Sequence, residues 1–493
     1  MGIVLQQTQN FMLFNSFSFA IFLPIVFICY WLLHKKNLKF QNILLLVASY
    51  FFYACWDYRF LFLLIFSTAL DYYSGLKIHE ANNLKAKKIW LWISILINLG
   101  FLAVFKYYNF FAENFAEALS QLGLKTNFYT LKIILPVGIS FYTFHGLSYV
   151  IDIYKNRIAP EKNAVDYSLF VSFFPLLVAG PIERATHLLP QIKKPRSFDY
   201  TKTIDGLRQI LWGLFKKVVI ADNCAEFANQ IFNNSAEMNG SSLFLGAFFF
   251  TFQIYGDFSG YSDIALGTAR LFGFDLLKNF SFPYFSRDIA EFWRRWHISL
   301  SSWFRDYIYI PLGGSRGSVF MKIRNTFLIF IVSGFWHGAN WTFIAWGMLH
   351  AIYFLPLLLS NKNRNHIGIV AKGNYLPTLR ETLNIILTFS LTAFAWIFFR
   401  ADSLNHAFQY ISELFSSSIF TIPNIEKKGK AVATLLLILV FMAIEWLGRE
   451  EEFALGNLEL KFKKPFRWTF YYALIAMLIY FAGSQQEFIY FQF

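Results

Sequence analysis

Charged residues are scarce in this sequence. They make up 15% of its 493 residues, against the roughly 25% that is usual for soluble domains. Only three cysteines occur, Cys29, Cys55 and Cys224, and their spacing matches no metal-ligand or redox motif. These shortages exclude an ordinary soluble domain, a disulfide-stabilised scaffold and a cysteine metal site, and we expect the protein to work without a metal.

Apolar side chains take the place of the missing charges, since 56% of the residues are hydrophobic and 21% are aromatic. Apolar runs of about 18 or more residues recur, and each is long enough to cross the ~30 Å hydrocarbon layer as a helix. The runs lack the short alternation of a membrane barrel, so the sequence predicts an all-α, polytopic helical membrane protein. We expect about 11–12 spans. They are placed at 17–33, 40–56, 59–76, 89–106, 133–151, 165–182, 242–262, 325–341, 343–359, 382–399, 431–447 and 468–483.

The segments outside these spans add little independent structure. Residues 204–222 and 285–312 are amphipathic, which is typical of re-entrant or interfacial helices. The first apolar run follows no positively charged region and precedes no cleavage pattern, so we interpret it as a retained span. No internal repeat is visible, and residues 1–493 are expected to form a single domain.

Basic residues predict how the chain is oriented. The net charge of +14 needs no nucleic acid to explain it, because lysine and arginine gather in the short loops between apolar runs. Alternation of these loops places the largest basic block, Arg184 to Lys217, in the cytoplasm and both termini outside. One cluster fits poorly, because Lys427, Lys428 and Lys430 would then lie outside.

One apolar stretch, Phe327 to Ala351, carries a histidine in its middle. A charged side chain at membrane depth costs about 2.5 kcal/mol or more, so His337 is a functional-site hypothesis. The alternative is a neutral histidine that is hydrogen-bonded between helices. Gly338 leaves room for a ligand or for a close helix contact, and Asn340 is placed to orient the imidazole or to bind a substrate oxygen. We expect His145 and His350, in other apolar contexts, to be structural.

The stretch from Glu291 to Gly314 reads as one amphipathic helix that ends near Pro311. Its two faces repeat at spacings of three and four residues. The apolar face is Phe292, Trp296, Leu300, Trp303 and Tyr307, and the polar stripe is Arg294, His297, Ser301 and Arg305. The stripe is either a basic surface or a guanidinium cradle for an anionic cofactor, because arginine binds phosphate bidentately.

Two further polar stretches interrupt apolar runs. In Val178 to Ala185, Gly180-Pro181 breaks a helix before Glu183, and an ordinary turn and a substrate-lining role both remain open. In Thr251 to Gly267, Asp257 and Asp263 need partners, and we expect a structural polar network in which they pair with arginines of the next segment.

These motifs resemble a known family. FWRRWHISLSSWFRDYIYIPLGG followed by FWHGANWTFIAWG is similar to the signature of the membrane-bound O-acyltransferases. GPIER, YGDFSGYSDIALG and the final EFIYFQF resemble the bacterial branch that contains alginate and peptidoglycan O-acetyltransferases and teichoic-acid D-alanyl transferase. The resemblance implies a helical core around a central tunnel, with His337 catalytic and His297 important beside it. One local difference is His145, where this branch leads us to expect glutamine.

The resemblance also implies a reaction. An acyl group, expected to be acetyl from cytoplasmic acetyl-CoA, would pass across the bacterial inner membrane to a hydroxyl of an extracytoplasmic polysaccharide such as alginate. His337, kept neutral by apolar surroundings, would take the hydroxyl proton. Asn340 or Trp336 would stabilise the oxyanion. The donor phosphates are assigned to Arg294, Arg295 and Arg305.

A relay residue, a partner protein and two alternatives complete the expectation. Tyr490 would relay the acyl group, as a terminal tyrosine is proposed to do in related systems, and an extracytoplasmic acetyl-handling protein would receive it. Within the family, the alternative is D-alanyl transfer from a carrier protein to teichoic acid. In another class, a polytopic transporter also needs broken helices, but paired halves are missing from this sequence.

Overall fold

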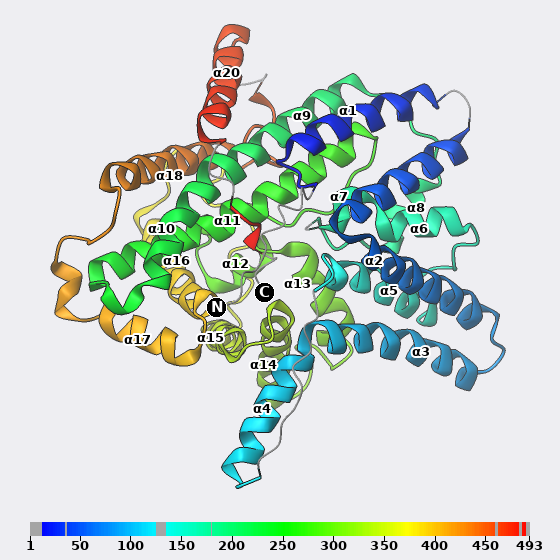
Figure 1. Ribbon diagram of the computed structural model, residues 1–493, viewed down its shortest axis with the longest axis horizontal. Coiled ribbons are helices and arrows are strands. Elements are labelled where there is room, and N and C mark those ends of the chain that lie inside the picture. The colour runs from blue at the N-terminus through cyan, green and yellow to red at the C-terminus, as the bar shows by residue number, and fades with distance from the viewer. Residues whose placement is uncertain are drawn as a thin grey trace, which may run out of the picture. The chain divides into compact units, whose positions relative to one another are not determined.

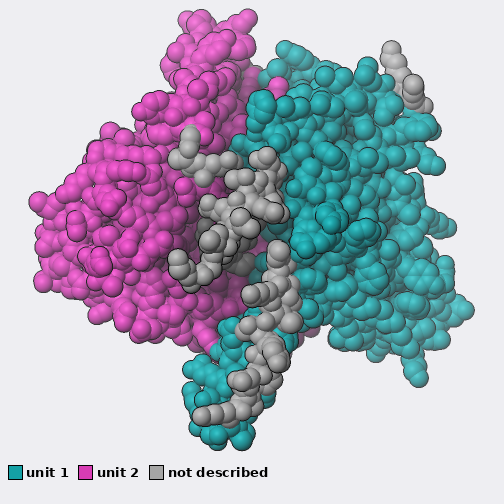
Figure 2. All heavy atoms as spheres, in the orientation of Figure 1, with its two compact units in different colours: residues 1–206, 268–276 teal, residues 207–267, 277–493 magenta. Residues whose placement is uncertain are grey.

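A computed structural model describes residues 12–34, 37–124, 135–178, 180–458, 462–482 and 486–489. The regular elements in these ranges are all helices, as the sequence predicts. The chain forms two compact units (Figure 2), unit 1 with residues 1–206 and 268–276, and unit 2 with residues 207–267 and 277–493. Two of the three boundaries, at 206/207 and 267/268, fall inside the helices α9 (Tyr200–Leu214) and α11 (Gly240–Leu271), and the third, at 276/277, lies between helices. The single-domain assignment stays a prediction.

Within the described ranges, six helical stretches are long and apolar enough to cross a membrane (Figure 1), which confirms a multi-pass helical membrane protein. They are α2 (Leu38–Glu80), the run from α3 (Leu84–Leu102) through η1 (Ala103–Tyr107) to α4 (Tyr108–Gln121), α14 (Val319–His337), α15 (Trp341–Leu359), α16 (Leu379–Arg400) and α18 (Lys428–Gly448). Shorter helices include α1 (Phe17–Leu32), α5 (Ile139–Tyr154), α8 (Ala185–Ile192), α10 (Asp222–Asn233), α17 (Leu404–Leu414) and α20 (Lys464–Phe481).

Side-chain caps fix where several of these helices begin. The Asn37 side chain accepts a hydrogen bond from the Lys39 amide at the start of α2. At the start of α16, Thr378 and Glu381 form a reciprocal capping box. Such caps satisfy amides that have no partner inside the helix, and each contributes about 1 kcal/mol.

A break in α2 separates two of the expected spans. Asp57 has the extended angles φ −160° and ψ 111° in the middle of this helix. Its carboxylate accepts a hydrogen bond from the backbone amide of Arg59 at 2.9 Å, so the residue caps the second half. The boundary predicted between 40–56 and 59–76 is therefore confirmed.

The expected span at 165–182 is wrong. The structure has two short helices there, α6 (Ala164–Ser172) and α7 (Phe174–Leu177). The backbone leaves helical geometry at Phe173, with ψ 116°, and Pro175 lacks the amide that would bond the carbonyl of Val171, which favours a break here. The Val171 carbonyl instead lies 3.4 Å from Nδ1 of His145 on α5.

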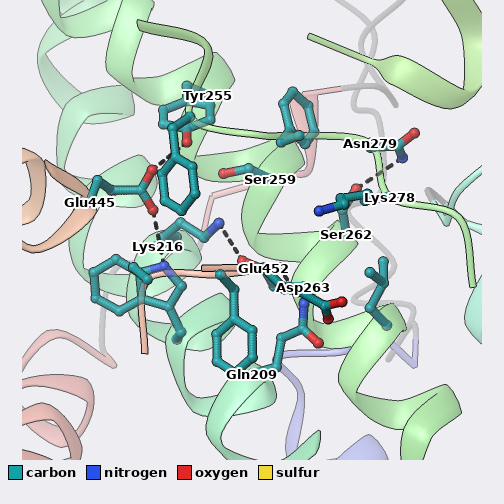
Figure 3. A pocket seen from close by; sticks show the side chains of 16 residues that line it. Gln209, Lys216, Tyr255, Ser259, Ser262, Asp263, Lys278, Asn279, Glu445 and Glu452 are labelled. Carbon is teal, nitrogen blue, oxygen red and sulfur yellow. Dashed lines mark hydrogen bonds and ion pairs between the residues drawn. The ribbon is translucent and has the colours of Figure 1, made fainter. Parts of the chain in front are cut away.

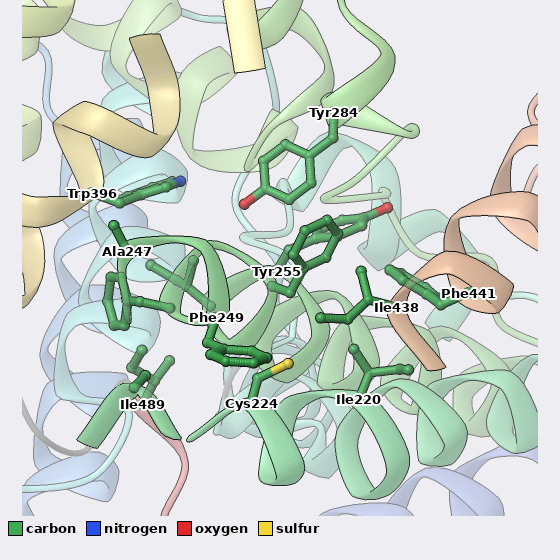
Figure 4. Close-up of a cluster of buried hydrophobic side chains, with 14 of the residues drawn as sticks. Ile220, Cys224, Ala247, Phe249, Tyr255, Tyr284, Trp396, Ile438, Phe441 and Ile489 are labelled. Atoms are coloured by element: carbon green, nitrogen blue, oxygen red, sulfur yellow. The ribbon is translucent and has the colours of Figure 1, made fainter. Parts of the chain in front are cut away.

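Unit 2 is built on the close approach of α11 to the end of α9 and to the π-helix η2 (Phe215–Ala221). A Cβ added at Gly213 would lie 2.6 Å from the carbonyl oxygen of Gly260, and a Cβ added at Gly260 would lie 2.7 Å from the carbonyl oxygen of Gly213. Only glycine permits this approach. Buried aromatic side chains pack around it, and Figure 4 shows Phe249, Tyr255, Tyr284, Trp396 and Phe441 among them.

Candidate active site

The helix expected through residues 291–310 is broken at His297. The structure has α12 (Ile289–Arg295) and α13 (Ile298–Phe304) in its place, followed by the π-helix η5 (Arg305–Tyr309). The Ile298 amide donates to the carbonyl of Asn279 at 2.9 Å, and the Ser299 hydroxyl donates to the Asn279 side chain at 2.6 Å. These bonds replace the ones that a continuous helix would make, so the single-helix prediction is wrong.

His297 adopts a left-handed backbone conformation at this break, with φ 43° and ψ 53°. A side chain with a Cβ pays roughly 1–2 kcal/mol for that conformation. Strain of this kind persists where the surrounding structure enforces it, and it concentrates at functional sites. The imidazole is 1% exposed and lies edge-on to Phe258 of α11, with ring centroids 4.7 Å apart. Burial lowers the pKa of His297 to about 3, so its ring is neutral.

His337 is the last residue of α14, and glycines fix its place. A Cβ at Gly334 would lie 2.2 Å from the carbonyl oxygen of Phe343, and one at Gly338 would lie 2.0 Å from the Phe343 ring. The turn between α14 and α15 is therefore as tight as glycine allows. The His337 ring, 4% exposed, packs against Trp336 at 4.8 Å and against Trp346 and Phe399 at 5.2 Å each.

The two histidines come together in space. Their ring centroids lie 6.3 Å apart, and Trp336 contacts both, at 5.9 Å from His297 and 4.8 Å from His337. The left-handed turn supplies one ring, and the end of an apolar helix supplies the other. The result is a pair of buried imidazoles within a largely aromatic enclosure, an arrangement suited to proton transfer.

The remaining residues assigned to the site lie around it in different ways. Asn340 caps α15, where its side-chain oxygen accepts from the Thr342 amide at 3.0 Å and its nitrogen donates to the carbonyl of Asp402 at 2.9 Å. Asn340 is thus engaged in building the turn after His337. Trp336, by contrast, has its indole beside both imidazoles.

The three arginines assigned to the donor phosphates make different contacts. Arg294 donates to the carbonyls of Asn363 and His366, both at 2.7 Å. Arg295 donates to the Glu291 carboxylate at 2.8 Å. The Arg305 side chain is 61% exposed and pairs with its neighbour Asp306. Arg294 and Arg295 thus hold chain segments in place, and their role toward donor phosphates stays a prediction.

The polar stretch on α11 pairs with lysines, which corrects the expected pairing with arginines. Lys216 pairs with Asp263, and Lys217 pairs with Asp257 at 2.7 Å. Adjacent residues of a regular α-helix point about 100° apart and so face different surroundings. Lys216 and Lys217 are adjacent and yet both buried, and they lie in the π-helix η2. The hydrophobic pattern carries no sign of a π-turn, so this arrangement could not be predicted from the sequence.

A small polar cavity lies beside Lys216 (Figure 3). Glu445 of α18 accepts hydrogen bonds there from Tyr255 and from the Trp212 indole, while Gln209 donates to Asp263. The cavity volume is about 30 Å³, which holds one or two water molecules and no cofactor. Glu445 was detectable in the sequence as a carboxylate inside the expected span at 431–447.

His145, His350 and the Gly180-Pro181 turn are tied into local structure. Nε2 of His145 accepts the backbone amide of Glu183 at 3.1 Å, and the Glu183 carboxylate lies 2.9 Å from His187. Nδ1 of His350 accepts from the Trp293 indole at 3.3 Å. Their contacts fit the structural roles expected of both histidines.

The terminal part of the site is described only as far as Ile489. Tyr490 lies outside the described residues, so its assignment as a relay stays a prediction. Within the described ranges, no group of three or more histidine, cysteine, aspartate or glutamate side chains is arranged to hold a metal ion.

Comparison with known proteins identifies similar sequences. The model of the membrane-bound O-acyltransferase family matches residues 157–389, a range that contains both His297 and His337. A probable alginate O-acetylase of Pseudomonas aeruginosa is 37% identical over 92% of this chain and 84% of its own length. A peptidoglycan O-acetyltransferase of Helicobacter pylori is 38% identical over 85% and 82%. A teichoic acid D-alanyltransferase of Streptococcus thermophilus is 30% identical over 55% and 69%.

Proposed function

This chain belongs to the membrane-bound O-acyltransferase family, and we propose that it transfers an acetyl group from cytoplasmic acetyl-CoA to a hydroxyl of an extracytoplasmic polysaccharide, such as alginate. Relatives named alginate O-acetylase and peptidoglycan O-acetyltransferase support the acetyl group and the polymer acceptor. The observation that carries the proposed site is the pair of buried imidazoles, with ring centroids 6.3 Å apart.

His337 is the general base of the proposed reaction. The acceptor hydroxyl oxygen attacks the carbonyl carbon of the thioester while an imidazole nitrogen of His337 takes the hydroxyl proton. The carbon–sulfur bond then breaks, and CoA leaves as the thiol after taking that proton. A positioned base of this kind contributes typically ~10²–10⁴-fold to the rate.

Two neighbours of His337 support this step. Trp336 touches both histidines, so its indole N–H is our preferred donor to the oxyanion. Asn340 is the weaker choice, because its amide already donates to Asp402. His297 lies beside both Trp336 and His337 as a neutral second imidazole, and we assign it to orienting the acceptor.

The direction of transfer follows from the charge distribution. We propose that the protein lies in the bacterial inner membrane with both termini outside, and that Arg294, Arg295 and Arg305 contribute to donor binding on the cytoplasmic side. Arg305 is the best placed of the three, because its side chain is 61% exposed and pairs with the adjacent Asp306, whereas Arg294 and Arg295 donate to backbone carbonyls of residues 363–368. The basic cluster that fits this orientation poorly is partly neutralised, since Lys427 and Lys430 both pair with Glu226.

Tyr490 is the proposed relay. Its phenol oxygen would take the acetyl group first, as an ester, and an extracytoplasmic partner protein would then move that group to the polymer. A Tyr490→Phe variant should insert normally and lose transfer to the polymer. Normal polymer acetylation by this variant would exclude the relay.

One alternative within the family is D-alanyl transfer from a carrier protein to teichoic acid. The relative that bears this name supports it over a smaller part of the chain. It would use the same base with a different donor surface. Family membership argues against the transporter alternative.

The experiment supplies labelled acetyl-CoA to inverted membranes that contain the wild type or His337→Ala. Label should reach protein or polymer in the wild type and fall by about 10²-fold or more in the variant, the size of a lost general base. Full transfer by a variant that inserts normally would contradict the assignment of His337. Labelled D-alanyl carrier protein, offered in parallel, distinguishes the alternative donor.

A further inference from the structure

Three buried charged residues of unit 2 meet at the end of the chain. Lys217 of η2 lies 2.8 Å from the carboxylate of Asp222 and 2.7 Å from that of Asp257, and all three side chains are at most 4% exposed. Two carboxylates face one ammonium, so the cluster needs further hydrogen-bond donors. We call Lys217, Asp222 and Asp257 the terminal seat.

The missing donors come from the carboxyl-terminal segment. The Ile489 amide donates to Oδ2 of Asp257 at 2.6 Å, and a backbone hydrogen bond from Gln486 reaches Asp222. The ammonium of Lys217 in turn donates to the Gln486 carbonyl at 3.1 Å. Each member of the seat therefore contacts the backbone of residues 486–489.

Side chains of the same segment are inserted beside the seat. Phe488 and Ile489 are fully buried, and the Phe488 ring lies 4.1 Å from that of Tyr261 on α11. Figure 4 shows Ile489 near Phe249 and Cys224 in the buried cluster. Backbone and side-chain contacts together fix this segment.

The seat and the histidine pair share one stretch of α11. Asp257 and Tyr261 hold the terminal segment, and Phe258, one residue after Asp257, lies against His297. Ile489 is the last residue that the structure describes, and Tyr490 follows it in the sequence.

We propose that the terminal seat holds residues 486–489 against the stretch of α11 that also packs on His297, and that acyl transfer depends on this anchoring. Lys217, Asp222 and Asp257 are then positioning residues for this segment, and the inference rests on the proposed function, whose relay residue follows the segment in the sequence. The buried ion cluster serves acyl transfer through the segment that it holds.

The test uses the full chain with Asp257→Ala and a matched control, Asp263→Ala. The first variant leaves Lys217 with one carboxylate partner, Asp222, so its buried pair stays balanced while Ile489 loses its acceptor. The control removes an aspartate of the same helix that pairs with Lys216. Asp257→Asn keeps an oxygen that can accept from Ile489, and it also serves if the alanine variant fails to fold.

Two readouts decide the outcome. Hydrogen exchange of the peptide that contains residues 486–489 should rise at least tenfold in Asp257→Ala, and it should stay at the wild-type level in Asp263→Ala. Acetyl transfer to the acceptor should fall at least tenfold in Asp257→Ala with unchanged binding of acetyl-CoA, and Asp257→Asn should regain part of both. A segment that stays protected in Asp257→Ala, or one that is released while transfer continues at the wild-type rate, overturns the proposal.

His337→Ala separates this inference from the proposed function. It should abolish transfer and leave the terminal segment protected. Transfer that survives in His337→Ala contradicts the proposed base, whereas the exchange data on Asp257→Ala test the seat independently of that result.

Discussion

His145 in unit 1 and His337 in unit 2 are almost equally buried, at 1% and 4% exposed, yet their surroundings differ. Around His145 lie backbone groups, the amide of Glu183 at Nε2 and the carbonyl of Val171 near Nδ1. Around His337 lie the rings of Trp336, Trp346 and Phe399. A base needs a lone pair that a substrate proton can reach. The lone pair of His145 already accepts the Glu183 amide, so burial alone does not distinguish this histidine from His337, the proposed base.

Among the substitutions that test this comparison, replacing His297 should lower acetyl transfer the most. His297→Ala should lower acetyl transfer by about tenfold or more, because it removes the second imidazole from the enclosure. The measurement is the turnover of labelled acetyl-CoA by purified variants in nanodiscs. Unchanged turnover would reduce His297 to a packing residue.

His297→Gly separates the side chain from its strained backbone. Glycine adopts the left-handed conformation without the roughly 1–2 kcal/mol penalty. We therefore expect this variant to keep its thermal stability better than His297→Ala while it loses transfer to the same extent. Recovery of transfer along with stability would mean that the turn matters and the imidazole does not.

The glycines beside His337 offer a smaller test of the same enclosure. Gly334→Ala would place a Cβ 2.2 Å from the carbonyl oxygen of Phe343. Such overpacking typically costs about 1–3 kcal/mol, so the variant should melt at a lower temperature and lose part of its transfer activity. Gly429→Ala is the control, because its added Cβ would meet no atom within 4 Å. Equal melting temperatures for the two variants would contradict the tight turn.

The contrast between the histidines also shows what the sequence can reveal. His337 was detectable because a titratable residue interrupts an apolar run. The break at His297 was not, since Trp296 and Leu300 keep helical spacing across it while Asn279, distant in sequence, takes the hydrogen bonds. The burial of Lys216 and Lys217 could not be predicted either, because a π-turn that buries two adjacent lysines produces no periodic pattern in the sequence.

The smallest effect is expected at His145, where this branch of the family leads us to expect glutamine. His145→Gln offers a side-chain oxygen that can accept the Glu183 amide in place of Nε2, while its NH₂ group can donate to Val171. Transfer should stay within about twofold of the wild type, since both backbone contacts can be kept and no base is lost. His145→Leu has a similar size and no acceptor, so it leaves the buried Glu183 amide unpaired and should be destabilised by about 1–3 kcal/mol. If His145→Gln instead lost transfer at unchanged thermal stability, His145 would take part in the chemistry, and the distinction between a backbone-tied and a ring-enclosed histidine would fail.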